Sequence, residues 1–227
     1  MLAGCSAALG IEDLHPPTIH GVVRDLTADT VPNASVVLYR DSDTGVPGGT
    51  PLDEATTDAQ GRFEFPITEP LPINVYLDLG DSRFVRTLVH VGQAVVDHTD
   101  LDVELLTLTT AGLRTLASDA HATQDPARSV VVARIVDAGG SSLAGATVYA
   151  RAGDSTTDLA QVCYSDAMTG FPCAAGRTRD DGIAWLFDVP AASLSITAVD
   201  GDGHSHAASL SFVAGPSLVF TPVRPAP

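Results

Sequence analysis

The stretches VPNASVVLY at residues 31–39 and LAGATVYAR at residues 143–151 share one pattern of small, turn-forming and β-branched residues. Ahead of them, GVVRD at 21–25 corresponds to ARIVD at 133–137 with the same spacing. Further on, TDAQG precedes RFEF at 57–65, and TRDDG precedes IAWL in the later copy, which carries extra residues before this point. Self-similarity of this kind indicates a repeated structural unit. We therefore predict two copies of one domain.

Each copy has the pattern of antiparallel strands. Asp58 to Gly61 predicts a tight hairpin turn in which glycine accepts a positive φ. Phe63 and Phe65 then alternate with charged residues, so one face of that strand is expected to be buried. The matching strand at 183–187 is apolar at both alternations, which predicts cover on both faces. Further strands are expected at 73–79, 84–91, 101–108, 194–199, 207–213 and 218–222.

The composition agrees with many short strands, because 15 prolines and 20 glycines interrupt the 227 residues. About seven strands per copy favour a sandwich, although a barrel stays open. Between the copies, apolar residues recur at helical spacing from Leu113 to Ala120, and Thr109 or Thr110 can cap this short amphipathic helix. The expected division is a tether at 1–17, a first domain at 18–107, a helical linker at 108–128, a second domain at 129–223 and a tail at 224–227.

The combination of VRD, VPNASVV and TTDAQGRFEF, with LAGATV and DVP in the second copy, resembles the carboxypeptidase regulatory-like family. Its members adopt transthyretin-like (prealbumin-like), Ig-like seven-stranded β-sandwiches. The resemblance implies an all-β fold of two tandem sandwiches, here joined by a short α-helix. It also implies a structural or binding role and brings no catalytic residue across.

The N-terminus predicts export. The residues LAGC, ending at Cys5, resemble the lipobox at which bacterial signal peptidases cut before a cysteine that is then lipidated. We expect an outer-membrane, periplasmic or cell-surface lipoprotein, attached to the membrane only through its lipid. A net charge of −16 argues against a nucleic-acid partner, since phosphates would be repelled. The expected partner is a protein or a glycan at the envelope, and the expected state is a monomer.

The segment CYSDAMTGFPC at 163–173 contains the other two of the three cysteines. In an exported protein, Cys163 and Cys173 are expected to form a disulfide across this loop. The bridge serves either to staple a surface insertion or to stiffen a binding loop. The candidate binding residues are Tyr164, Met168, Phe171 and, outside the loop, Trp185.

The segment VDGDGHSHA at 199–207 offers a weak metal site, because Asp202, His204 and His206 alternate as on one strand face. Asp-Gly-Asp-Gly is also an ordinary turn sequence, and we favour the turn. No G-x-S-x-G, H-E-x-x-H, Walker-type or dinucleotide-binding motif is present in the sequence. We therefore expect a non-catalytic protein without a cofactor; the alternative is a metal-dependent or hydrolytic enzyme on a transthyretin-like sandwich.

Overall fold

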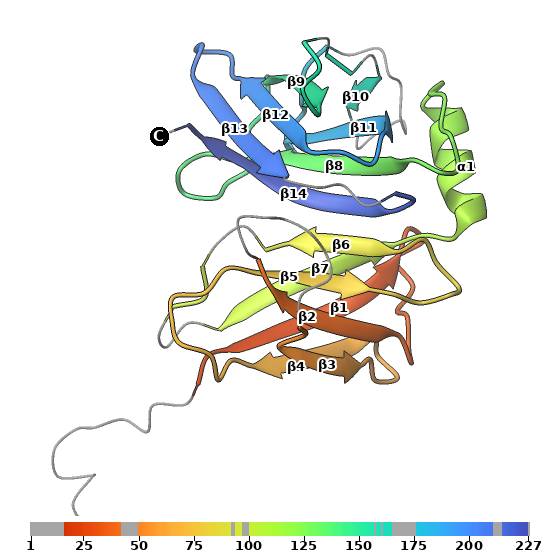
Figure 1. The fold of residues 1–227 in the computed structure, drawn as a ribbon, viewed down its shortest axis with the longest axis vertical. Helices are drawn as coiled ribbons and strands as arrows, with labels where there is room; N and C mark the ends of the chain where they lie inside the picture. The colour runs from red at the N-terminus through yellow and green to blue at the C-terminus, as the bar shows by residue number, and fades with distance from the viewer. Residues whose placement is uncertain are drawn as a thin grey trace, which may run out of the picture.

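A computed structural model describes residues 16–41, 50–91, 94–96, 100–156, 158–159, 161–164, 176–210 and 215–226. The described chain is almost entirely β-structure with one helix (Figure 1). Its first half contains β1 (Thr18–Asp25), β2 (Ser35–Arg40), β3 (Asp53–Thr56), β4 (Arg62–Pro66), β5 (Val75–Leu79), β6 (Thr87–His90) and β7 (Leu101–Thr107). Its second half contains α1 (Thr110–Asp119), β8 (Ser129–Ile135), β9 (Thr147–Ala152), β10 (Val162–Tyr164), β11 (Ile183–Val189), β12 (Leu194–Val199), β13 (Ser205–Leu210) and β14 (Leu218–Pro225).

The first sandwich is built from strands β1 to β7. One layer has the order β4-β1-β7, and the other has the order β3-β2-β5-β6. Strand β4 shows why the layers face each other, since Phe63 and Phe65 are buried while Arg62 and Glu64 are exposed. The two phenylalanine rings lie 5.5 Å apart in an apolar core that both layers share. The predicted alternation in this strand is therefore confirmed.

The second sandwich repeats this plan with strands β8 to β14. Strand β8 pairs antiparallel with β11 and parallel with β14, as β1 pairs with β4 and β7. A buried threonine recurs as well: Thr57 Oγ1 accepts the N–H of Ala34 at 2.9 Å, and Thr178 Oγ1 accepts the N–H of Ala146 at 2.9 Å. Each hydroxyl also donates to a backbone carbonyl 2.8 Å away. The sequence repeat is thus a structural repeat, and the fold class is two β-sandwiches.

The third strand differs between the copies. In the first copy β3 pairs with β2, whereas in the second β10 pairs with β11 in the other layer. The change leaves the N–H of Val148 on β9 without a strand partner, and it donates to the hydroxyl of Tyr164 at 2.9 Å instead. Burial acts to raise the pKa of the Tyr164 phenol.

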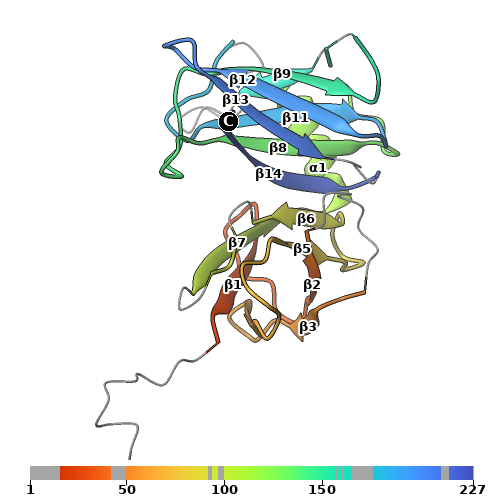
Figure 2. The ribbon, with the colours of Figure 1, turned by 60° about the vertical axis from the view of Figure 1, so that its left-hand side comes forward.

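The two sandwiches share a continuous sheet. Strand β14 lies between β8 and β6 and runs parallel to both, with Leu218 opposite Thr87 and Phe220 opposite Val89 (Figures 1 and 2). The N–H of Leu218 also donates to the carbonyl of Arg86 at 2.8 Å. The copies are therefore joined strand to strand, and not through the helical segment alone. Strand β14 also runs past residue 223, where the second domain was expected to end.

Helix α1 covers the outer face of β8, β11 and β14. Thr109 caps it, because its Oγ1 accepts the N–H of Gly112 at 3.0 Å. The buried stripe of the helix, centred on Leu113 and Leu116, belongs to one apolar cluster with Trp185 and Phe187 of β11. This cover explains why β11 is buried on both faces, as its sequence pattern predicts.

One turn recurs at several strand connections. In the turn at Asp58, the carboxylate accepts the N–H of residues 60 and 62 at 2.8 Å, and Gly61 has a φ of +72°. Asp25, Asp137 and Asp200 make the same pair of bonds to the residues two and four positions further on. The residue three positions after the aspartate has a positive φ in each case, and it is glycine except at Ala28.

Candidate functional site

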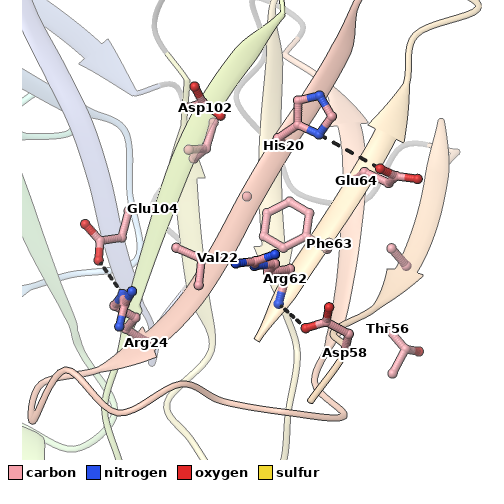
Figure 3. Close-up of a pocket in the computed structure, with 13 residues that line it drawn as sticks. His20, Val22, Arg24, Thr56, Asp58, Arg62, Phe63, Glu64, Asp102 and Glu104 are labelled. Atoms are coloured by element: carbon pink, nitrogen blue, oxygen red, sulfur yellow. Dashed lines mark hydrogen bonds and ion pairs between the residues drawn. The ribbon is translucent and has the colours of Figure 1, made fainter. Parts of the chain in front are cut away.

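The candidate site is the outer face of the β4-β1-β7 layer of the first sandwich (Figure 3). Alternate side chains of a strand point to opposite faces, so the residues that miss the core point out from this layer. They are His20, Val22 and Arg24 from β1, Arg62 and Glu64 from β4, and Asp102 and Glu104 from β7.

A groove of about 930 Å³ is associated with this face. It continues past β4 towards β3, where Ala55, Thr56 and Asp58 also line it. Phe63 closes part of the floor, because its ring fills the space that a side chain at position 21 would need; a Cβ on Gly21 would lie 2.0 Å from the ring. The groove is open to solvent, so the arrangement favours contact with a surface over enclosure of a small molecule.

The charges on this face are mixed but mostly negative. Arg24 Nε lies 3.1 Å from Glu104 Oε1, so these two charges largely neutralise each other. His20 lies between two carboxylates, with Nδ1 3.9 Å from Glu64 Oε2 and Nε2 3.9 Å from Asp100 Oδ2. Exposed pairs of this kind add about 0–1 kcal/mol to stability. Glu64 can therefore pair with a partner at little cost to the fold, whereas Asp100 already accepts the N–H of Thr18 at 2.8 Å.

The corresponding row of the second sandwich is apolar and covered. There Val132 lies in register between Trp185 on β11 and Phe220 on β14. Helix α1 packs over this row. Its counterpart in the first sandwich, by the same register, is polar throughout: Glu64, His20 and Asp102. Among the described residues, no helix lies over that polar row.

Two of the residues expected to bind a ligand lie in the core. Tyr164 is 4 % exposed and Trp185 is 6 % exposed. Tyr164 supports β9, and Trp185 packs beneath α1, so the expectation that they form a binding surface is wrong. Their hydrophobic partners come from distant segments, which the local sequence around them does not reveal.

The remaining loop residues cannot be placed. Met168, Phe171 and Cys173 lie outside the described residues, as does Cys5. Cys163 is buried, with 1 % of its surface exposed. Its pairing with Cys173 and the lipidation of Cys5 stay predictions.

The histidine-rich segment is a turn stabilised by Asp200. His204 Nδ1 and His206 Nε2 lie 3.2 and 3.3 Å from Asp200 Oδ2, and His206 Nδ1 lies 3.2 Å from the carbonyl of Val136. Burial acts to raise the pKa of the Asp200 carboxyl, but hydrogen bonds from the His204 N–H and from both imidazoles outweigh it and lower the pKa to about 2. The carboxylate that joins the histidines is therefore Asp200; Asp202 contributes only a backbone N–H, at 2.9 Å. Within the described ranges, no group of three or more His, Cys, Asp and Glu residues is placed to hold a metal ion.

Sequence reasoning missed the groove, because each of its residues is ordinary for a solvent-facing strand. A usable signal lay in the repeat itself. Where the second copy has Trp185 and Val132, the first has Glu64 and His20, and this contrast marks a face that one copy covers and the other leaves open.

No family model and no curated protein matches the chain. Solved structures that it resembles include the Bacillus anthracis TIE protein (11 % identity over 93 % of this chain and 34 % of that chain, TM-score 0.31). They also include a streptococcal ancillary pilin (13 %, 95 % and 64 %, TM-score 0.32) and the shaft pilin SpaA of Lactobacillus rhamnosus GG (10 %, 94 % and 98 %, TM-score 0.30). This chain thus spans about a third of the first and just under two thirds of the second. At these TM-scores the likeness carries no argument about function, and the proposals below rest on the residues of this chain.

Proposed function

We propose that this protein is a non-catalytic structural and binding module of the bacterial cell envelope, related to the carboxypeptidase regulatory-like domains. A lipid on Cys5 attaches it to a membrane. The first sandwich presents the groove over β4, β1 and β7 to a protein partner, while the second sandwich serves as its support.

One observation carries this proposal. The row Glu64–His20–Asp102 occupies the position of the apolar row that α1 covers in the second sandwich. The two sandwiches are copies of one unit, so their corresponding faces are expected to be alike. A face that is open in one copy and buried in the other is therefore a candidate for a function that only one copy has. Loops and faces on a rigid scaffold carry binding sites for the same reason.

A protein fits the groove better than a glycan does. Sugar rings favour exposed aromatic side chains on which to stack, and the aromatic residue that lines this groove, Phe63, is 5 % exposed. An exposed tyrosine, Tyr149, lies on the second sandwich, on β9. Charged side chains over a sheet are instead typical of the polar part of a protein–protein interface.

The membrane attachment is proposed to be by lipid. Among the described residues no helix is long and apolar enough to cross a membrane. Several acyl chains on one cysteine hold a protein stably, where one chain gives only marginal binding. Expression with the full upstream region should yield a lipid-labelled protein in the membrane fraction. Cys5→Ser should move it to the soluble fraction, and Ser6→Ala, the matched control, should not; an unlabelled wild-type protein would refute the anchor.

The binding role is tested by photo-crosslinking in intact cells of the native host. A crosslinking amino acid at position 22 should give a discrete protein adduct, because Val22 lies in the middle of the groove. The same amino acid at position 149, which lies on the second sandwich, should give none. Equal adducts from both positions, or none from position 22, would overturn the binding role.

A further inference from the structure

We propose that the groove of the first sandwich receives an amphipathic helix of a partner protein whose contact face carries basic residues. The helix lies across β4, β1 and β7 as α1 lies across β11, β8 and β14. This inference rests on the proposed function and names the class of partner that the groove selects.

The second copy shows how a helix can pack on these three strands. Helix α1 crosses its strands rather than following them, as both overall views show (Figures 1 and 2). The strands beneath it have the same order and register as β4, β1 and β7. A sheet face of this shape therefore already accepts one helix in this protein. The first sandwich offers the same three strands without a helix among the described residues.

The polar residues that stand in the first sandwich where the second has apolar ones indicate which side chains the partner helix should carry. A helix as apolar as the buried stripe of α1 would strip water from Glu64 and Asp102 without returning a hydrogen bond, which is unfavourable. Lysine or arginine side chains would instead pair with these carboxylates. Arg24 already neighbours Glu104, and Arg62 adds a second positive charge to this face, so the carboxylates left for a partner are Glu64 and Asp102 beside His20.

The spacing fits a helix that crosses the strands. Glu64 and Asp102 lie on the strands that flank β1, so their backbones are about 10 Å apart, since neighbouring strands are about 4.8 Å apart. Two helical turns rise by about 10.8 Å. Basic residues at positions i and i+7 of the partner therefore reach both carboxylates. A residue between them, at i+3 or i+4, would lie over His20, which is opposite both Glu64 and Asp102.

The test uses the full chain and a synthetic helical peptide. The peptide carries lysine at i and i+7 and leucine at i+4, and a second peptide carries glutamate in place of the lysines. Backbone amide NMR shifts should change at β4, β1 and β7 on titration with the lysine peptide and should not change with the glutamate peptide. The variant Glu64→Lys with Asp102→Lys should weaken binding at least tenfold.

A control variant with the same change of charge on the second sandwich distinguishes binding at the groove from general attraction of a basic peptide to an acidic protein. Asp180→Lys with Asp202→Lys alters two exposed residues of the second sandwich by the same charge and should leave the affinity within twofold. Equal weakening in both variants would overturn the inference, as would shifts spread over both sandwiches. Calcium or magnesium alone giving the same shifts would show that an ion occupies the groove, and concentration-dependent shifts without peptide would show a second copy; either result also overturns it.

The two proposals fail separately. A discrete adduct from position 22 in cells, with no binding of the lysine peptide, would keep the binding role and reject the basic helix. Absence of the adduct would reject the binding role itself.

Discussion

Replacing the turn glycine Gly61 by alanine should destabilise the protein more than its positive φ alone explains. A Cβ built on Gly61 would lie 2.7 Å from the carbonyl oxygen of Val23, which is backbone and cannot swing away. Gly182, its counterpart in the second copy, would place a Cβ 2.6 Å from the carbonyl oxygen of Ile135. Gly140 has a comparable φ of +84°, but a Cβ there meets nothing within 4 Å.

Alanine substitutions at the three glycines distinguish the cost of a positive φ from the cost of a Cβ that collides with the backbone. An alanine in the left-handed region costs about 1–2 kcal/mol at each position, and the reduced freedom of the unfolded chain returns about 0.4–1 kcal/mol at each. These contributions cancel when the variants are compared. Overpacking against backbone typically costs about 1–3 kcal/mol. Gly61→Ala and Gly182→Ala should therefore each lower the free energy of unfolding by about 1–3 kcal/mol more than Gly140→Ala does.

Urea unfolding followed by circular dichroism measures this difference, provided that the slope of free energy against denaturant stays constant. A Gly140→Ala variant as destabilised as the other two would show that backbone strain alone accounts for these positions. A Gly61→Ala variant with the stability of the wild type would refute the description of the turn.

Three further predictions concern Ala28, Asp200 and the pair Cys163 and Cys173. Ala28→Gly should stabilise the protein by about 1 kcal/mol in the same urea assay, because Ala28 has a φ of +66° where the related turns have glycine, and no gain would contradict this. Asp200→Asn should destabilise the protein at pH 7 and much less near pH 2: the folded-state pKa, lowered to about 2, means that the stabilisation is present above the ordinary value near 3.8 and is lost as the pH falls towards 2. An equal cost at both pH values would show that the carboxylate charge is not what matters. If Cys163 and Cys173 are paired, reduction of the purified exported protein should raise its intact mass by two hydrogens, and labelling of both thiols before reduction would exclude the bridge.

Much of the fold could be predicted because strands, turns and helices depend on residues that are close together in the sequence. The strand expected at 194–199 coincides with β12. The helix expected between the copies is α1, with Thr109 as its cap. Alternation in β4 and its absence in β11 correctly distinguished a strand buried on one face from a strand buried on both.

Such patterns could not predict the strand pairing that joins the two copies. Alternation shows which face of a strand is buried, but it does not show which strand lies beside its edge. Leu218 to Phe220 were expected only as part of a strand at 218–222, and that expectation did not say that they pair with both β8 and β6. The different pairing of β3 and β10 was hidden for the same reason.

The candidate site could be predicted only in part. Non-catalytic binding was expected, but the binding residues were predicted in the loop that contains Tyr164 and not on the first sandwich. Tyr164 is a core residue because it supplies a hydroxyl to Val148, which is distant in sequence. The groove around His20 emerges only when the two copies are compared position by position.

The shared strand β14 also sets the order in which the protein can be completed. The edge of β6 is finished only when Leu218 to Phe220 pair with it, and those residues are made long after β6 itself. Until then the first sandwich has an open sheet edge, which is the kind of edge that recruits strands from other chains. A ribosome that stalls before β14, or a protease that removes it, would therefore expose an adhesive edge on the half of the molecule that was already complete.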